Sequence, residues 1–140
     1  MSNFASNGWG IYFHPQLFAT QYKELFERVS RLREQLPEAE YKTHTTVKLF
    51  AAITVAIESK IPSDPFASHF TLTGALKRYG RVKKMGLPER YRLFFRAFDT
   101  EELKVIVILW LEDVLKVEGY CKKAHKAYAE ICRNQHLVSE

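Results

Sequence analysis

The stretch YGRVKKMGLPERYRLFFRAF, residues 79–98, decides the fold class of this chain. Basic and apolar side chains alternate along the stretch on both sides of a turn at residues 86–88. This period of two residues is that of a β-strand. The two arms, residues 79–85 and 90–98, therefore predict a β-hairpin. Alternation gives the second arm one apolar face and one face that carries three arginines. The residues expected on that second face are Arg90, Arg92, Phe94, Arg96 and Phe98.

Two more segments on either side of this hairpin have strand character. Residues 105–109 (VIVIL) are apolar at every position, as in a strand covered on both faces, so we expect them at the centre of the sheet. Residues 9–13 (WGIYF) follow the turn dipeptide Asn7-Gly8 and predict a first strand.

Helical patterns occupy the rest of the chain. Pro15 suits the first turn of a helix whose apolar residues recur at spacings of three and four until Pro37 ends it. Residues 43–60 predict a second, well-buried helix. Residues 61–74 contain two prolines and no period, so they predict a loop. The tail predicts a last helix with one apolar face, formed by Val117, Cys121, Ala124, Tyr128 and Ile131.

The expected order is therefore strand, helix, helix, three antiparallel strands and helix. This order predicts a single α+β domain, residues 1–140, whose helices pack against one face of an antiparallel sheet. A chain of 140 residues is long enough to bury a core without disulfides. Cys121 and Cys132 are too few for a disulfide framework, so we expect free thiols in the cytoplasm.

The charge of the chain favours a polyanionic partner. Lysine and arginine total 21 against 16 acidic residues, which gives a net charge of +5 and a pI near 9.2. Nucleic acid is the first expectation and an anionic membrane surface the second. No run of 18 apolar residues and no signal-like start is present, so we expect no membrane partner.

The chemistry is expected on the hairpin, where the basic residues gather. Arg81 and Lys83 share a face of the first arm, with Lys84 beside them, and the three arginines share a face of the second. Guanidinium groups bind phosphate oxygens bidentately, so this face fits RNA. The alternative is a solvated edge hairpin that its charges protect from aggregation. Phe94 and Phe98 could stack bases or simply pack.

Several motifs of the chain, which follow one another as they do in that family, resemble the YhaV family of toxins, within the RelE-like superfamily. They are YRLFFR at residues 91–96 with RVK at 81–83, NGW at 7–9 with YFHP at 12–15, and TVKL at 46–49. From about residue 111 the tail matches the family only loosely.

The resemblance implies a RelE-like microbial-ribonuclease fold and the toxin of a type II toxin–antitoxin system. The implied activity is that of an endoribonuclease that needs no metal or other cofactor, cuts messenger RNA, also on the ribosome, and so inhibits translation and growth. The implied partners are RNA and an antitoxin of the AbrB/PrlF type, with operator DNA as a target of the complex. The alternative from another class is a non-catalytic nucleic-acid-binding or regulatory module on the same fold.

The resemblance also assigns residues to the site. Arg92 matches the arginine of the family's Tyr-Arg motif, and Arg81 and Lys83 match the basic pair before it. Tyr128 resembles the tyrosine near the C-terminus, although it also fits the apolar stripe of the last helix. Lys122 or Lys123 would take the place of a late basic residue.

Cleavage through the 2′-OH needs a base, cations and an acid. Arg92 and Arg81 would stabilise the charge on phosphorus. Lys83 or Lys84 could serve as the base if neighbouring cations favour its neutral form. His125 or Tyr128 is the candidate acid, and Arg90 and Arg96 are expected to bind RNA.

No metal site is expected. Cys121 with His125 and Cys132 with His136 look like ligand pairs, but on one helix they would extend over roughly 22 Å, too far for one tetrahedral ion. The pair Glu112 and Asp113 is expected as the acidic start of the last helix.

Overall fold

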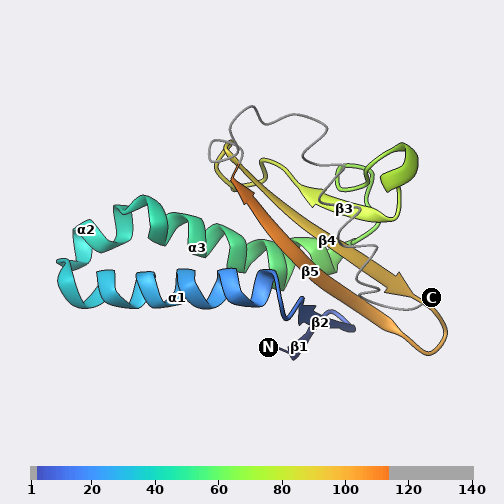
Figure 1. Ribbon diagram of the computed structural model, residues 1–140, viewed down its shortest axis with the longest axis horizontal. Helices are drawn as coiled ribbons and strands as arrows, with labels where there is room; N and C mark the ends of the chain where they lie inside the picture. The colour runs from blue at the N-terminus through green and yellow to red at the C-terminus, as the bar shows by residue number, and fades with distance from the viewer. Residues whose placement is uncertain (1–2, 114–140) are drawn as a thin grey trace.

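The central strand of the sheet is β5 (Lys104–Asp113), as its apolar sequence predicts. The computed structural model describes residues 3–113 of the chain. Within them a five-stranded sheet has the order β1-β2-β5-β4-β3 (Figure 1). The other strands are β1 (Asn3–Ser6), β2 (Trp9–Phe13), β3 (Tyr79–Val82) and β4 (Tyr91–Asp99).

The sheet is mixed, so the prediction of an antiparallel sheet is wrong for one pair of strands. Strand β5 is antiparallel to β4 but parallel to β2. A parallel neighbour needs a long crossover, and here the helices and the β3–β4 hairpin separate the two strands in the chain. Strand β1 was not predicted, because a four-residue segment carries too little pattern; it pairs antiparallel with β2.

The helices begin close to their predicted positions. Helix α1 (Phe18–Gln35) ends just before Pro37, as expected, but Pro37 also precedes an unpredicted short helix, α2 (Glu38–Thr43). The predicted second helix, residues 43–60, is α3 (Thr45–Val55) followed by a π-helical turn (Ala56–Lys60). His44 separates α2 from α3: its backbone is extended, and its Nδ1 accepts a hydrogen bond from the Thr46 amide at 3.1 Å.

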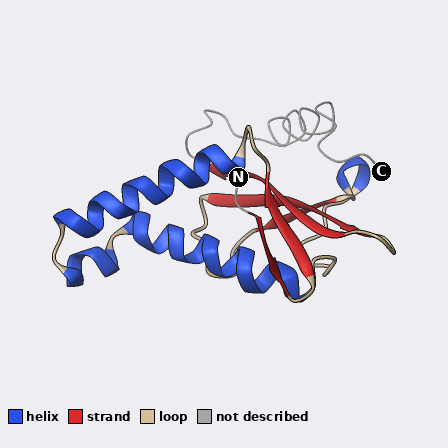
Figure 2. Ribbon diagram, turned by 90° about the horizontal axis from the view of Figure 1, so that it is seen from below, coloured by secondary structure: helices blue, strands red, loops and turns tan. Residues whose placement is uncertain are grey.

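The predicted loop of residues 61–74 contains short ordered turns. Helix α4 (Ile61–Ser63) continues the π turn because Pro62 fits a first helical turn. A 3-10 turn, Gly74–Leu76, and a bridge between Thr71 and Gly80 complete the approach to β3. Helices α1 and α3 lie side by side and extend beyond the sheet (Figure 2). Among residues 3–113, none of the helices combines the length and the apolar character that crossing a bilayer requires.

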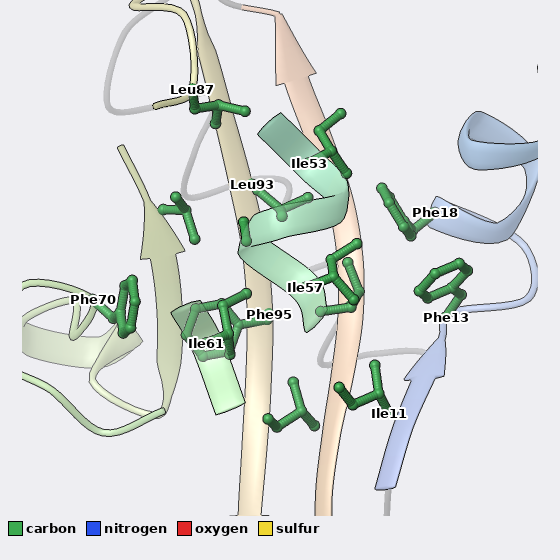
Figure 3. Packing of buried hydrophobic residues seen from close by; sticks show 14 of the residues in the cluster. Ile11, Phe13, Phe18, Ile53, Ile57, Ile61, Phe70, Leu87, Leu93 and Phe95 are labelled. Atoms are coloured by element: carbon green, nitrogen blue, oxygen red, sulfur yellow. The ribbon is translucent and has the colours of Figure 1, made fainter. Parts of the chain in front are cut away.

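The main core fills the space between the sheet and the helices. Side chains from β2, β4 and β5 meet those of α1, α3 and the turns that follow α3 (Figure 3). The most deeply buried large side chains of this core are Ile11, Phe18, Ile53, Ile57, Ile61, Phe70, Leu93, Phe95, Ile106 and Ile108.

A second, smaller cluster covers the opposite face of β4 and β5. It contains Tyr79, Phe94, Phe98, Val107 and Leu109. Phe94 and Phe98 are only 5% and 8% exposed, so of the two roles left open for them, packing is the one observed. Alternation placed these rings on the correct face of the strand. The alternation could not show that other apolar side chains on this face bury the two rings.

Strand β5 carries a β-bulge next to these rings. Phe94 pairs with Trp110 and Phe95 pairs with Ile108, so Leu109 is the extra residue. A bulge of this kind re-aims side chains locally, and Leu109 packs into the second cluster.

Candidate nucleic-acid interface

Three arginines lie on one face of the hairpin formed by β3 and β4. Residues directly opposite each other in antiparallel strands share a face. Arg81 is opposite Phe94 and Arg96 is opposite Tyr79, while Arg92 is two residues before Phe94. We call the surface formed by Arg81, Arg92 and Arg96 the arginine face. The alternation in the sequence predicted it correctly for these three residues.

Arg92 is held in place by backbone carbonyls rather than by an acidic side chain. Its Nη1 donates to the Tyr91 carbonyl at 2.9 Å and also to the Glu89 carbonyl. Its partner in register is Glu112, but that carboxylate accepts from the Trp110 indole N–H at 2.6 Å. Arg92 is therefore fixed in direction, and within residues 3–113 no carboxylate pairs with its guanidinium to compensate the positive charge.

Arg81 and Arg96 are both half-buried, and Arg96 lies against aromatic rings. The Arg81 amide donates to the Phe70 carbonyl at 2.8 Å, which fixes its strand from the outer side. Arg96 lies over the Phe98 ring at 4.5 Å and the Tyr79 ring at 5.6 Å. In the part of the chain that the structure describes, no carboxylate forms an ion pair with Arg81.

Arg90 is not on this face. It lies in the turn before β4 and donates through Nη2 and Nε to the two carboxylate oxygens of Asp113, at 2.7 and 3.0 Å. The hydrogen bond to Asp113 raises the pKa of Arg90 above its ordinary value. Asp113 and Glu112 both belong to β5, so the prediction that they begin a helix is wrong: the strand runs four residues further than its apolar core at 105–109.

Lys83 and Lys84 lie beyond the end of β3, because this strand stops at Val82 and not at Met85. Lys84, Met85 and Gly86 have φ of 66°, 58° and 92°, which takes the chain out of the strand into a tight turn. The Met85 carbonyl accepts a hydrogen bond from the Lys60 ammonium. Lys83 and Lys84 are both exposed, and this turn, instead of the alternation along a strand, determines where they lie.

The remaining predicted site residues lie outside the described residues. They are Lys122, Lys123, His125 and Tyr128, and the same holds for the cysteine and histidine pairs of the tail. Between residues 3 and 113, no three histidine, cysteine or acidic side chains come together as metal ligands could.

One histidine that sequence reasoning did not single out is buried. His14 follows β2 and is 4% exposed; burial lowers its pKa below the usual histidine value. Its amide donates to the Ile108 carbonyl at 2.8 Å, and its Nδ1 accepts from the Gln16 amide at 3.3 Å. These contacts give His14 a structural role at the start of α1.

The pair Lys77 and Arg78, immediately before β3, was also passed over. Both are exposed, and with Arg96 and Phe66 they line a pocket of about 410 Å³. Two adjacent cations directly before the hairpin were the signal in the sequence that could have found them.

Comparison with known proteins identifies the family of this chain. The family model described as "Toxin with endonuclease activity, of toxin-antitoxin system" matches residues 11–136. The ribonuclease toxin YhaV of Escherichia coli K12 is 35% identical over 137 residues, covering 93% of this chain and 85% of the relative. The toxin YhaV of Escherichia coli O157:H7 matches with the same values. No solved structure matches the chain.

These matches confirm the family suggested by the motifs at residues 7–15, 46–49 and 81–96. The family match also continues through the tail to residue 136, past the point near 111 at which the likeness of motifs becomes loose. The chain belongs to the YhaV family and is the endonuclease toxin of a toxin–antitoxin system.

Proposed function

We propose that this endonuclease toxin cuts RNA on the arginine face, through attack of a ribose 2′-OH and without a metal ion. RNA as substrate is supported by the name of the K12 relative, a ribonuclease toxin that aligns with 93% of this chain. The observation that carries the proposal is the placement of Arg81 directly across from Phe94 and of Arg92 two residues before Phe94, on one face of the hairpin.

The reaction breaks one bond and forms another on the same phosphorus. The 2′-oxygen attacks the adjacent phosphate, its proton passes to a base, and the bond from phosphorus to the 5′-oxygen breaks as that oxygen receives a proton. The products are a 2′,3′-cyclic phosphate and a 5′-hydroxyl. Negative charge grows on the non-bridging oxygens in between, and guanidinium N–H groups aimed at them lower the barrier.

Arg92 suits this task because it is preorganised. The carbonyls of Glu89 and Tyr91 hold one nitrogen of its guanidinium, so little reorientation is needed when substrate binds. Arg81 would bind the same phosphate from β3. Lys83 or Lys84 would act as the base and Tyr128 or His125 as the acid.

Flanking phosphates would bind the other cations. Arg96 lies two residues from Phe94 on the same strand. Arg90 can reach a phosphate only through the nitrogen that Asp113 does not occupy. Lys122 and Lys123 complete the predicted set.

The cognate antitoxin is implied by the family. We propose an antitoxin of the AbrB/PrlF type that covers the arginine face, and a toxin–antitoxin complex that binds operator DNA. Messenger RNA, including RNA on the ribosome, is the proposed substrate, which places the action of the toxin in the cytoplasm.

The test is cleavage of a defined RNA by the purified toxin in excess EDTA. We expect cleavage to persist with an unchanged rate, since arginines supply the positive charge, and we expect the upstream fragments to end in 2′,3′-cyclic phosphate. An all-2′-O-methyl RNA is the control and should stay intact, because its attacking oxygen is blocked. Activity that EDTA removes and a divalent ion restores would refute the metal-free mechanism.

A further inference from the structure

The pocket of about 410 Å³ opens where β3 begins, between the loop at residues 65–71 and the strand β4. Small-molecule pockets in proteins measure about 300–1,000 Å³, so its volume suffices for one nucleotide. Among residues 3–113, the lining contains three cations, Lys77, Arg78 and Arg96, and no carboxylate.

Two other pockets among the described residues have different chemistry. One, beside α1, is mainly apolar and aromatic, with a single cation, Lys23. The other, between α1 and the ends of β4 and β5, includes Glu24, Glu112 and Asp113. The pocket at β3 is thus the one of these three whose charge suits an anionic ligand.

An exposed aromatic ring stands at the rim of the pocket. Phe66 is 54% exposed, and its ring lies 6.0 Å from the Trp9 ring, which is itself buried. The Lys104 ammonium also lies over the Trp9 ring, 4.7 Å from its centroid. Phe66 is therefore supported by packing while much of its surface stays open, as in the aromatic platforms on which bases of single-stranded RNA stack.

The floor of the pocket depends on a glycine. A Cβ at Gly80 would lie 2.2 Å from the Phe95 ring, which packs edge-to-face on Phe70 with ring centroids 5.5 Å apart. Any side chain at this position would displace that ring. The absence of a side chain at Gly80 thus leaves the Phe95 ring in place beside the pocket.

The pocket is continuous with the arginine face. Arg96 contributes to both, and Arg81 follows Tyr79 of the pocket by two residues on β3, which is roughly 7 Å along a strand. An RNA chain with one phosphate at Arg81 and Arg92 would bring its neighbouring nucleotide to the pocket.

We propose that this pocket binds one nucleotide of the RNA next to the cleaved bond, with its base stacked on Phe66 and its phosphate at Lys77. The pocket then sets the base preference at that position. This inference rests on the proposed function for the identity of the substrate.

The experiment compares Phe66→Ala and Lys77→Ala with the unchanged toxin. Binding of the non-cleavable 2′-O-methyl RNA is measured across a salt series, and base frequencies around the cut are read by sequencing fragment ends. Phe66→Ala should weaken binding about ten-fold and flatten the base preference at one position. Lys77→Ala should reduce the salt slope of log affinity by about 0.7, the loss of one phosphate contact.

Matched controls are available on α1. Phe26 is exposed by the same 54%, and Lys23 is exposed beside it; both line the pocket of about 550 Å³ that has a single cation. Phe26→Ala and Lys23→Ala should leave affinity, salt slope and base preference unchanged. Circular dichroism and melting curves verify that all four variants fold.

The other possible outcomes also decide whether the pocket binds a nucleotide and recognises its base. Unchanged binding and base preference in a folded Phe66→Ala protein would refute the pocket, as would an effect confined to antitoxin binding, which marks a protein interface. Weaker binding with unchanged base frequencies would refute base recognition. If the unchanged toxin does not cut RNA but Phe66→Ala still loses affinity for it, the proposed function fails, and only the binding of a nucleotide by the pocket stands.

Discussion

At the scale of single residues, Arg90 and Arg92 show how neighbouring arginines acquire different roles. Arg90 is 42% exposed and forms a two-point ion pair with Asp113, whose side chain is 10% exposed. Within residues 3–113, the hydrogen-bond partners of the Arg92 guanidinium are backbone carbonyls and no carboxylate. A carbonyl fixes the direction of a guanidinium without cancelling its charge, so Arg92 is the better group to meet a phosphate.

We predict that Arg92→Ala abolishes growth inhibition and lowers the rate of RNA cleavage about 100- to 1,000-fold, the usual effect of removing one donor to a charged transition state. The melting temperature should change little, since no buried ion pair is broken. Rates are measured on a labelled RNA under single-turnover conditions.

Arg33→Ala is the matched control, because Arg33 is exposed in the last turn of α1, and it should cut normally. Arg92→Lys should recover only part of the rate, because an ammonium cannot bind two phosphate oxygens as a planar guanidinium does. A folded Arg92→Ala protein with full activity would remove Arg92 from the site.

At the scale of elements, one side chain completes the sheet where a strand is missing. Strand β2 pairs with β5 only as far as Ile108, and the chain then turns into α1. The Gln21 side chain donates from Nε2 to the Leu111 carbonyl and accepts at Oε1 from the Leu111 amide, both at 2.8 Å. It thus makes the pair of hydrogen bonds that a neighbouring strand would make.

We predict that Gln21→Leu lowers the free energy of unfolding by about 1–3 kcal/mol, because a partly buried amide and carbonyl lose their partner. For a domain of this size this corresponds to a fall in melting temperature of roughly 3–10 °C. Thermal and urea unfolding measure it. Gln35→Leu, at an exposed position of the same helix, is the control and should melt within about 2 °C of the unchanged protein; equal melting of the two variants would contradict the role of Gln21.

At the scale of the whole molecule, the net charge of +5 and the arginine face favour any acidic partner. An acidic antitoxin that covers Arg81 and Arg92 would be attracted by the same positive charge that attracts RNA. Charges at a surface are screened over about 10 Å in 0.1 M salt, so the association of toxin and antitoxin should depend strongly on salt.

We predict that non-cleavable RNA and antitoxin compete for the toxin. Titration of 2′-O-methyl RNA into the complex at low salt should release antitoxin, as followed by fluorescence anisotropy of a labelled antitoxin. Raising salt should slow association more than it speeds dissociation. If RNA and antitoxin bind together without loss of affinity while the complex stays inactive, inhibition must act elsewhere than on the arginine face.

Local patterns were sufficient for much of the fold. The period of two at residues 90–98 predicted β4, and five apolar residues in a row predicted the central β5, because burial on both faces demands such a sequence. The spacing of three and four predicted α1. Short elements escaped: β1 has four residues and α2 has six, and pieces of that length carry too little pattern to separate from loops.

By itself, the sequence determined the family, the hairpin and the presence of Arg81, Arg92 and Arg96 on one face, since alternation is a local property of the chain. Only the tertiary structure decided what each charge meets. The end of β5 brings Asp113 to Arg90 across 23 residues, and the approach to β3 brings Phe66 to Lys77 and Arg96. Such contacts depend on the register of β4 with β5 and on where the loop at residues 65–71 packs, which are set by the whole core and not by any local period.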